Sequence, residues 1–204
     1  MIIGLCGKKR SGKGEIAKYL SNKLNIPIYS FASSLKDLVF QVSGLTDSDK
    51  DNNEYYTGRV FNLSPLKKEL KKYDKLTIEE LDTLKAIEYY KISEIYRYLL
   101  QYIGTNIFRN RNENHWIQTL KNKFSYNEIN KSSFIIDDIR FINEYKFISS
   151  LPDSKCIKVI RNNNYDDNHI SENEIDKIRF TYKFNNNYNT LYDMYIGLDK
   201  FFGI

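Results

Sequence analysis

The chain begins with Met1-Ile-Ile-Gly-Leu-Cys-Gly-Lys-Lys-Arg-Ser-Gly-Lys-Gly14, and this stretch decides the fold. It opens with a short apolar run, which predicts a buried central strand of a parallel sheet. Gly7, Gly12 and Lys13 then follow in the pattern G-x-x-x-x-G-K of a phosphate-binding loop, or P-loop. Glycines at these positions let the backbone curl so that its amide groups form an anion-binding nest at a helix start.

The residues of this loop have separate predicted roles in binding ATP. Lys13 is expected to reach the β- and γ-phosphates, as the lysine of this pattern does. Gly14 departs from the pattern, because a Ser or Thr hydroxyl normally binds magnesium at that position. A Mg²⁺ ion can instead be held by phosphates, water and one carboxylate. The residues predicted to bind ATP are Gly7, Arg10, Ser11, Gly12, Lys13, Gly14 and Glu15.

Length and composition limit the class of protein. With 204 residues and 41% hydrophobic content, the chain can form a single domain around one good core. The formal charge of +5 favours anionic partners but does not separate a nucleic-acid binder from an enzyme of phosphorylated metabolites. Cys6 and Cys156 each lie in an apolar run, which favours a reducing compartment such as the cytoplasm. Apolar runs are too short for a membrane span, so no membrane partner is expected.

Beyond the loop, short apolar runs alternate with helical patterns. Residues 15–24 and 35–42 carry apolar side chains on one helical face, and residues 26–31 form a strand between them. Later apolar runs at 134–136 and 156–160 read as two further strands. The alternation predicts an α/β fold, in which a parallel sheet has helices on both faces and ligands bind at the carboxyl ends of the strands.

Two segments interrupt this pattern. Residues 43–115 contain a long polar stretch and then a capping box, Thr77 with Glu80, followed by helical spacing toward Gln101, which predicts a helical insertion. Residues 161–175 are mostly polar and predict a short lid. The whole of 1–204 is thus expected to be one P-loop domain with these two additions. A closing helix over residues 191–202 is predicted to turn inward the side chains of Leu191, Tyr195, Leu198 and Phe202.

Asp137 and Asp138 are the predicted magnesium ligands. They follow the predicted strand at 134–136, where an acidic residue holds the metal in other P-loop enzymes. Adjacent aspartates can equally cap the next helix, and the sequence leaves both interpretations open. Asp37 and Asp138 are the carboxylates to test for proton transfer, although a phosphate acceptor is already anionic and needs a general base less than a hydroxyl does.

Four further blocks resemble the deoxynucleoside monophosphate kinases of tailed phages and large DNA viruses. They are Phe31-Ala-Ser-Ser-Leu-Lys36; Leu100-Gln-Tyr-Ile-Gly-Thr105 followed by Arg109 and Trp116; Asp138-Ile-Arg-Phe-Ile-Asn-Glu144; and Arg161 followed by Asp167-Asn-His-Ile-Ser-Glu172. The third block is the most specific, and all four stand in the family's order behind a P-loop. The resemblance covers most of the chain. Gly14 and the long insertion before Thr77 depart from the family's pattern.

The resemblance implies transfer of the γ-phosphoryl group of ATP, with Mg²⁺, to a deoxynucleoside monophosphate. It also implies a small-molecule substrate without a stable nucleic-acid partner, a homodimer as the assembly to test, and the host cytoplasm if the source is viral. The implied catalytic residues are Lys13, Asp138, Arg140 and Arg161, and the implied substrate-binding residues are Lys36, Gln101, Thr105, Arg109, Trp116, Arg140 and Glu144. Arginine suits both roles, because its planar guanidinium binds phosphate oxygens in pairs.

Structural alternatives exist for several of these residues. Arg140 could form an internal ion pair with its acidic neighbours, and Arg161 could be a surface charge. Trp116 could be a wall on which the base stacks, or it could belong to the core, as aromatic residues more often do. Arg109 and Arg111 are both candidates for binding the acceptor phosphate, but they could equally form a charged helix face. His169 is a candidate for a hydrogen bond within the lid. The competing functions are a dephospho-coenzyme A kinase-like enzyme and a nucleotide-gated nucleic-acid-binding module.

Overall fold

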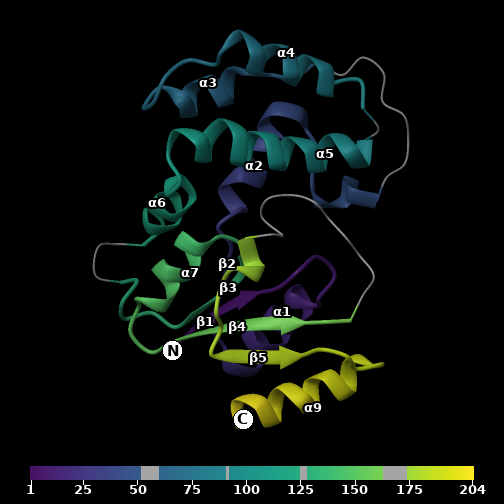
Figure 1. Cartoon of the computed structure of the whole chain (residues 1–204), viewed down its shortest axis with the longest axis vertical. Coiled ribbons are helices and arrows are strands. Elements are labelled where there is room, and N and C mark those ends of the chain that lie inside the picture. Colours follow the sequence, from purple (N-terminus) through teal and green to yellow (C-terminus); the bar gives the residue numbers. More distant parts are fainter. Residues whose placement is uncertain (52–59, 91, 125–127, 163–173) are drawn as a thin grey trace. The chain divides into compact units, whose positions relative to one another are not determined.

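The computed structural model describes residues 1–51, 60–90, 92–124, 128–162 and 174–204 (Figure 1). Contacts divide the chain into two compact units. The first, here called the sheet unit, consists of residues 1–31 and 120–204, and the second, called the helical unit, consists of residues 32–119. The predicted insertion at 43–115 lies within the helical unit, while most of the predicted lid lies outside the described residues.

The sheet unit contains a five-stranded parallel sheet (Figure 1). Its order is β2-β3-β1-β4-β5, so the strand before the P-loop is central. This confirms the predicted α/β fold with a parallel sheet. The strands are β1 (Ile2–Cys6), β2 (Ile28–Tyr29), β3 (Phe134–Ile139), β4 (Ser154–Ile160) and β5 (Tyr182–Asn185).

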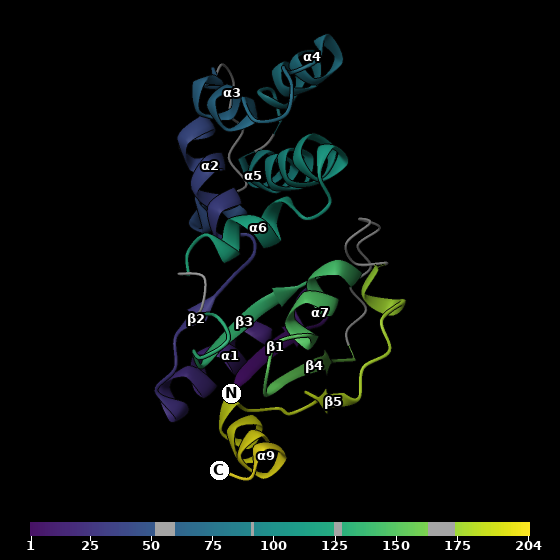
Figure 2. The same ribbon diagram turned by 90° about the vertical axis from the view of Figure 1, so that its left-hand side faces the viewer.

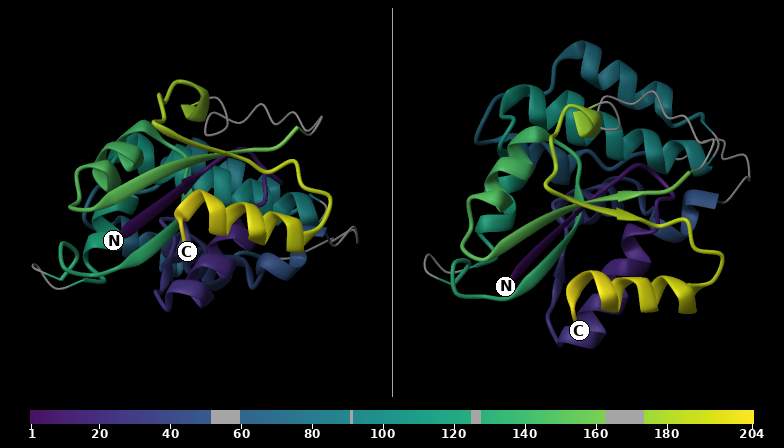
Figure 3. Two further views of the ribbon diagram at one scale, coloured as in Figure 1. Left: turned by 90° about the horizontal axis from the view of Figure 1, so that it is seen from below. Right: turned by 60° about the horizontal axis from the view of Figure 1, so that its bottom comes forward.

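Helices cover both faces of this sheet, as predicted. α1 (Lys13–Leu24) and α9 (Leu191–Phe202) lie on one side, and α7 (Ile142–Ser149) lies on the other (Figure 3). The first face buries an apolar cluster whose side chains come from four strands and from α1 and α9: Ile3, Leu5, Ile16, Ala17, Leu20, Ile135, Ile157, Val159, Phe184, Met194 and Leu198. Burial of this apolar surface is the main favourable contribution to the stability of the unit.

The C-terminal helix has the predicted bounds but a different inner face. Its N-cap is Thr190, whose hydroxyl accepts a hydrogen bond from the Asp193 backbone amide. Leu198 is buried as predicted, whereas the prediction for Leu191 is wrong, since 53% of this residue is exposed. Leu191 is the first residue after the N-cap and lies on the solvent side of the helix. The side chain that reaches the core from the first turn is that of Met194.

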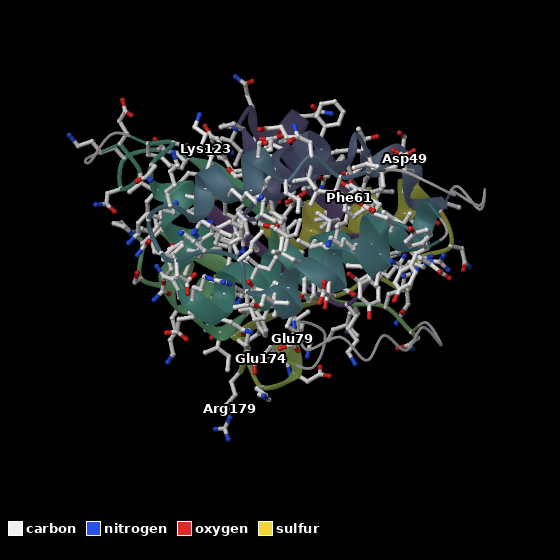
Figure 4. The ribbon with its side chains drawn as sticks, turned by 90° about the horizontal axis from the view of Figure 1, so that it is seen from above. Asp49, Phe61, Glu79, Lys123, Glu174 and Arg179 are labelled. Atoms are coloured by element: carbon white, nitrogen blue, oxygen red, sulfur yellow. The ribbon has the colours of Figure 1, made fainter. Side chains whose placement is uncertain are left out.

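The helical unit is built from short helices (Figure 2). They are α2 (Ser33–Ser43), η1 (Asp47–Asp51), α3 (Ser64–Leu70), α4 (Ile78–Ile87), α5 (Ile92–Gln101), η2 (Tyr102–Arg109) and α6 (His115–Lys121), whose last two residues belong to the sheet unit. η2 has the hydrogen bonding of a π-helix. The core of the helical unit includes Phe61, which is only 6% exposed and is labelled in Figure 4.

The Thr77 capping box is present as predicted. The Thr77 hydroxyl accepts a hydrogen bond from the Glu80 amide, and the Glu80 carboxylate accepts one from the Thr77 amide. The helix that follows ends at Ile87, however, and α5 starts only at Ile92. The helical spacing toward Gln101 therefore belongs to two helices. None of the helices that the structure describes is long and apolar enough to cross a bilayer.

Candidate active site

The P-loop lies at the carboxyl edge of the sheet, where three strand ends meet. Cys6, the last residue of β1, pairs with Ile139 of β3 on one side and with Lys158 of β4 on the other. The residues that follow these strands therefore share one edge with the loop. They include Arg140 after β3 and Arg161 after β4.

The two glycines of the loop pattern are required by close packing. Gly7 has φ 159° and Gly12 has φ 94°. A Cβ on Gly7 would lie 2.5 Å from the Val159 carbonyl oxygen, and one on Gly12 would lie 2.3 Å from the Asn186 side-chain nitrogen. Only glycine fits without displacing these neighbours, and only glycine adopts the positive φ at residue 12 without strain. The loop then passes directly into α1.

Lys13 folds over the loop. Its Nζ donates hydrogen bonds to the carbonyl oxygens of Gly7 at 2.5 Å and Lys8 at 2.9 Å, and it lies 3.4 Å from the Ser11 hydroxyl. These contacts hold the ammonium group against the backbone of the loop. Phosphate oxygens bind an ammonium group as charged acceptors, so they can replace these neutral carbonyl contacts with stronger ones.

Cys6 stands directly before the loop but is not a candidate nucleophile. Burial raises the pKa of the Cys6 thiol to about 12, although the neighbouring Lys13 and Lys158 ammonium groups act in the opposite direction. The thiol therefore stays protonated at neutral pH, and only a thiolate would attack or bind a metal.

The two aspartates lie inside β3 rather than after it, because the strand continues to Ile139. Asp138 joins β3 to the end of β2: one carboxylate oxygen accepts a hydrogen bond from the Ser30 hydroxyl at 2.5 Å, and the other accepts one from the Phe31 amide at 2.8 Å. Asp137 is half-buried on the same strand. The β1–β3 register shifts at these residues, since Gly4 pairs with Ile136 but Cys6 pairs with Ile139. Neither is the N-cap of the next helix, α7, because that position belongs to Phe141.

Glu144 caps α7, a role that the sequence analysis did not include. Its carboxylate accepts hydrogen bonds from the backbone amides of Arg140 at 2.9 Å and Phe141 at 3.1 Å. The residue is 3% exposed. Glu144 therefore holds the turn between β3 and α7, which contains Arg140. Arg140 is half-buried and follows β3 at the same edge of the sheet as the P-loop. The predicted contact of Glu144 with substrate stays a prediction.

Arg161 begins the segment after β4 and is exposed. The predicted lid residues 163–173, His169 among them, lie outside the described residues. Just beyond this segment, Asp176 binds two ammonium groups at 3.0 Å, those of Lys8 in the P-loop and Lys158 in β4. Partial burial acts to raise the pKa of Asp176, but the two lysines outweigh it and hold the pKa below its usual value. The residue directly after the predicted lid, Asp176, is thus linked to the P-loop by charge.

Five of the predicted substrate-binding residues lie in the helical unit: Lys36, Gln101, Thr105, Arg109 and Trp116. The Lys36 ammonium pairs with Asp47 at 2.8 Å, and the second oxygen of that carboxylate accepts a hydrogen bond from the Tyr96 hydroxyl. Burial and this hydrogen bond raise the pKa of Tyr96, so its hydroxyl stays protonated. Gln101, Thr105 and Arg109 are half-buried and recur at every fourth residue along α5 and η2. Helical stretches with π-type bonding often occur at functional sites.

Trp116 has the environment of a core residue. It is 5% exposed, and its indole nitrogen donates a 3.0 Å hydrogen bond to the Gly104 carbonyl. Gly104 in turn lies against α2, since a Cβ there would be 2.6 Å from a methyl group of Leu35. These contacts favour the structural alternative for Trp116 over a wall on which a base stacks.

Arg111 is also held in a structural cluster. Its guanidinium donates to both oxygens of Glu80, to Asp74 and to two backbone carbonyls. The Glu80 carboxylate, which also belongs to the capping box, and Asp74 raise the pKa of Arg111 further above neutrality, against the effect of burial. Arg109, by comparison, donates to the Glu113 carbonyl at 2.9 Å. The contacts of Arg111 favour a structural role, and the predicted role of Arg109 at an acceptor phosphate stays a prediction.

Two features, one in each unit, were missed from the sequence. Asn186, buried beside the P-loop, follows a strand that was not predicted. The helical unit also contains a cavity of about 350 Å³, lined by Ser34, Asp37, Leu38, Gln41, Pro65, Lys68, Glu69, His115, Trp116 and Thr119. The Nε2 atom of His115 has no hydrogen-bond partner among the described residues. A pattern of isolated polar residues on separate helices gives no signal for such a cavity.

Comparisons with known proteins agree with this geometry. A family model described as deoxynucleotide monophosphate kinase matches residues 56–196, a range that begins after the P-loop and covers more than half of the chain. A protein of Acanthamoeba polyphaga mimivirus, provisionally named a deoxynucleotide monophosphate kinase, is 28% identical over 194 residues. That match covers 88% of this chain and 84% of the viral protein. The chain is therefore a member of the deoxynucleotide monophosphate kinase family.

Proposed function

We propose that this kinase transfers the γ-phosphoryl group of ATP to a deoxynucleoside monophosphate and so produces the diphosphate. The observation that carries the proposal is the P-loop at the end of β1, with the ends of β3 and β4 beside it, in a member of this family. Phosphoryl transfer depends mainly on positioning the two nucleotides and on neutralising the charge of their phosphates. Lys13, Arg140 and Arg161 are cations that follow strands at this edge of the sheet.

The donor side of the site would be the P-loop. Its backbone amides would bind the β-phosphate region, and the Lys13 ammonium would exchange its carbonyl contacts for phosphate oxygens. Mg²⁺, when bound, would neutralise charge on the β- and γ-phosphates. Asp137 and Asp138 are the residues that would hold it, directly or through water, because their strand adjoins β1 and no hydroxyl is present at Gly14.

On the acceptor side, arginines would bring the second phosphate into place. Arg140 would bind the acceptor phosphate, and Arg161, at the start of the proposed lid over 161–175, would close over the transferring group. Residues 43–115 would form the acceptor-binding insertion, with Lys36 just before them. Gln101, Thr105 and Arg109 are the residues that would face the nucleotide from η2 and the end of α5.

The reaction then needs no covalent enzyme intermediate. An oxygen of the acceptor phosphate forms a bond to the γ-phosphorus while the bond from that phosphorus to the β–γ bridging oxygen breaks, so that ADP leaves. The acceptor oxygen is already anionic near neutral pH, because the second pKa of a phosphate monoester is about 6. The task of the protein is therefore to hold the two nucleotides in line and to exclude water.

A coupled assay of ADP formation tests this function. Each deoxynucleoside and ribonucleoside monophosphate is offered as acceptor, beside dephospho-coenzyme A and single-stranded DNA. We expect at least one deoxynucleotide to stimulate ADP formation strongly. Stimulation by dephospho-coenzyme A alone, or by DNA alone, would contradict the proposal and favour a different kinase or a nucleic-acid-dependent ATPase.

Two lysine variants sharpen the assay. Lys13→Ala removes the phosphate-binding ammonium and is expected to abolish turnover while the chain stays folded. Lys18→Ala is the matched control, because Lys18 is an exposed residue of the same helix whose ammonium pairs with Glu15. Equal activity of both variants would remove the P-loop from the mechanism.

A further inference from the structure

Asn186 is a buried polar residue that contacts the P-loop from the far end of the chain. It directly follows β5, and its backbone amide donates a 2.7 Å hydrogen bond to the Ile160 carbonyl of β4. Only 3% of the residue is exposed. Its main chain is therefore fixed by the sheet, and its side chain has a defined direction.

That side chain binds one peptide group of the loop. The Asn186 Nδ2 atom donates a 2.8 Å hydrogen bond to the Ser11 carbonyl oxygen, across 175 residues of sequence. In a planar trans peptide, the carbonyl and the following N–H point in opposite directions. Anchoring the Ser11 carbonyl toward Asn186 therefore turns the Gly12 N–H to the opposite side.

The fit between the two segments is close. A Cβ on Gly12 would lie only 2.3 Å from the Asn186 nitrogen, so the glycine of the loop pattern provides the space that the asparagine occupies. Gly12 is also the N-cap of α1. The orientation of its amide thus decides whether the first free N–H at this helix start is available to an anion.

We propose that Asn186 is a positioning residue for the phosphate-binding loop: it holds the Ser11–Gly12 peptide so that the Gly12 amide is ready to bind the triphosphate of the donor. This inference rests on the proposed use of ATP at this loop. A loop that is already oriented loses less freedom on binding, so its affinity is higher. Without this hydrogen bond, the free loop can rotate the peptide, and binding must restore it.

The test compares substitutions at two neighbouring asparagines. Asn186→Ala removes the donor, and Asn186→Asp places a carboxylate oxygen against the Ser11 carbonyl. Asn185→Asp is the matched control, because it makes the same charge change one residue earlier at an exposed position. Binding is measured by titration with a fluorescent ATP analogue. The KM values for ATP and for the acceptor, and the melting temperature of the unliganded protein, are measured beside it.

We expect both Asn186 variants to bind the analogue on the order of tenfold more weakly, the effect of one lost hydrogen bond. Their KM for ATP should rise while the KM for the acceptor is retained, and Asn185→Asp should behave like the unsubstituted chain. A lower melting temperature with unchanged ATP affinity, or failure of both Asn186 variants to fold, would make Asn186 a structural residue only and overturn the inference. If the unsubstituted chain binds no ATP, the proposed function itself fails, and the inference with it.

Discussion

The Ser30 hydroxyl donates a 2.5 Å hydrogen bond to the Asp138 carboxylate, which ties the end of β2 to β3. β2 has only two residues, and the Phe31 amide just beyond it donates to the other oxygen of the same carboxylate. A residue that was predicted to bind metal therefore has a structural task in the folded chain.

Asp138→Ala is expected to lower the free energy of unfolding by about 1–3 kcal/mol, because it removes the carboxylate that accepts hydrogen bonds from the Phe31 amide and the Ser30 hydroxyl. Chemical denaturation measures this change. Asp137→Ala is the comparison on the same strand, and we expect it to raise the Mg²⁺ concentration needed for half-maximal activity more than it lowers stability. A larger loss of stability in Asp137→Ala than in Asp138→Ala would contradict the structural role of Asp138. An unchanged Mg²⁺ requirement in Asp137→Ala would contradict the proposed place of Asp137 at the metal.

Substitution of Gly14 tests whether a hydroxyl at this position of the P-loop would strengthen the binding of Mg²⁺. No other described atom, apart from its chain neighbours and its own helix, lies within 4 Å of the position that a Cβ at residue 14 would take. Gly14→Ser should therefore fold, with a gain of roughly 0.5 kcal/mol in helix propensity. It should also lower the Mg²⁺ concentration for half-maximal activity several-fold, since its hydroxyl would stand at the usual metal-binding position.

The matched control is Gly14→Ala, which gains helix propensity without a hydroxyl. A Mg²⁺ titration of kinase activity compares the two variants. Identical titration curves for Gly14→Ser and Gly14→Ala would show that residue 14 does not approach the metal.

Substitutions of Arg111 and Arg109 are expected to have different effects, because Arg111 has a structural role and Arg109 is a candidate for substrate binding. Arg111 is 11% exposed at its side chain and pairs with Glu80, which is 13% exposed. Removing one partner of such a pair is expected to cost about 2–4 kcal/mol, because the other charge loses its compensation. Arg111→Ala should thus lower the melting temperature clearly, whereas Arg109→Ala should mainly raise the KM for the deoxynucleotide. The opposite pattern in thermal melts and kinetics would exchange the two roles.

His115 gives the helical unit a predictable pH dependence. Burial, assisted by the Lys72 ammonium, lowers the pKa of His115 from 6.5 to about 4. Between these values the unfolded chain binds a proton that the folded chain does not, so stability falls as the pH is lowered through this window. The loss at pH 4 should reach up to about 3 kcal/mol.

Denaturation curves at several pH values measure this effect, and His115→Phe is the test variant because it keeps an aromatic ring between Phe108 and Trp116. Its stability should change less between pH 6.5 and 4 than that of the unsubstituted chain. An equal slope in both proteins would mean that His115 is not the titrating group.

The sequence predicted those parts of the fold that depend on local pattern. The P-loop with its flanking β1 and α1, the Thr77 capping box and the bounds of α9 each follow from a continuous motif or a regular apolar spacing. β5 was missed because it is an edge strand in which only Phe184 is buried, so it carries no apolar run. The break between α4 and α5 was missed because the helical spacing of apolar residues continues across it.

The sequence predicted the parts of the site that a continuous motif defines. It did not predict the parts that depend on contacts between distant segments of the chain. Lys13 and its loop followed from spacing. Asn186 did not, because its role depends on a contact with Ser11 over 175 residues of sequence. Similarly, the role of the Glu144 carboxylate as a cap of α7 was not predicted, because it depends on the position of the Arg140 and Phe141 backbone amides.

The most direct measurement of the central claim follows the phosphate itself. ATP labelled with ³²P at the γ-position is incubated with the enzyme, Mg²⁺ and one deoxynucleoside monophosphate at a time, and the products are separated by chromatography. We predict that the label appears in the deoxynucleoside diphosphate and that Lys13→Ala abolishes this transfer. Label found only in inorganic phosphate, or retained in ATP with every deoxynucleotide, would contradict the account.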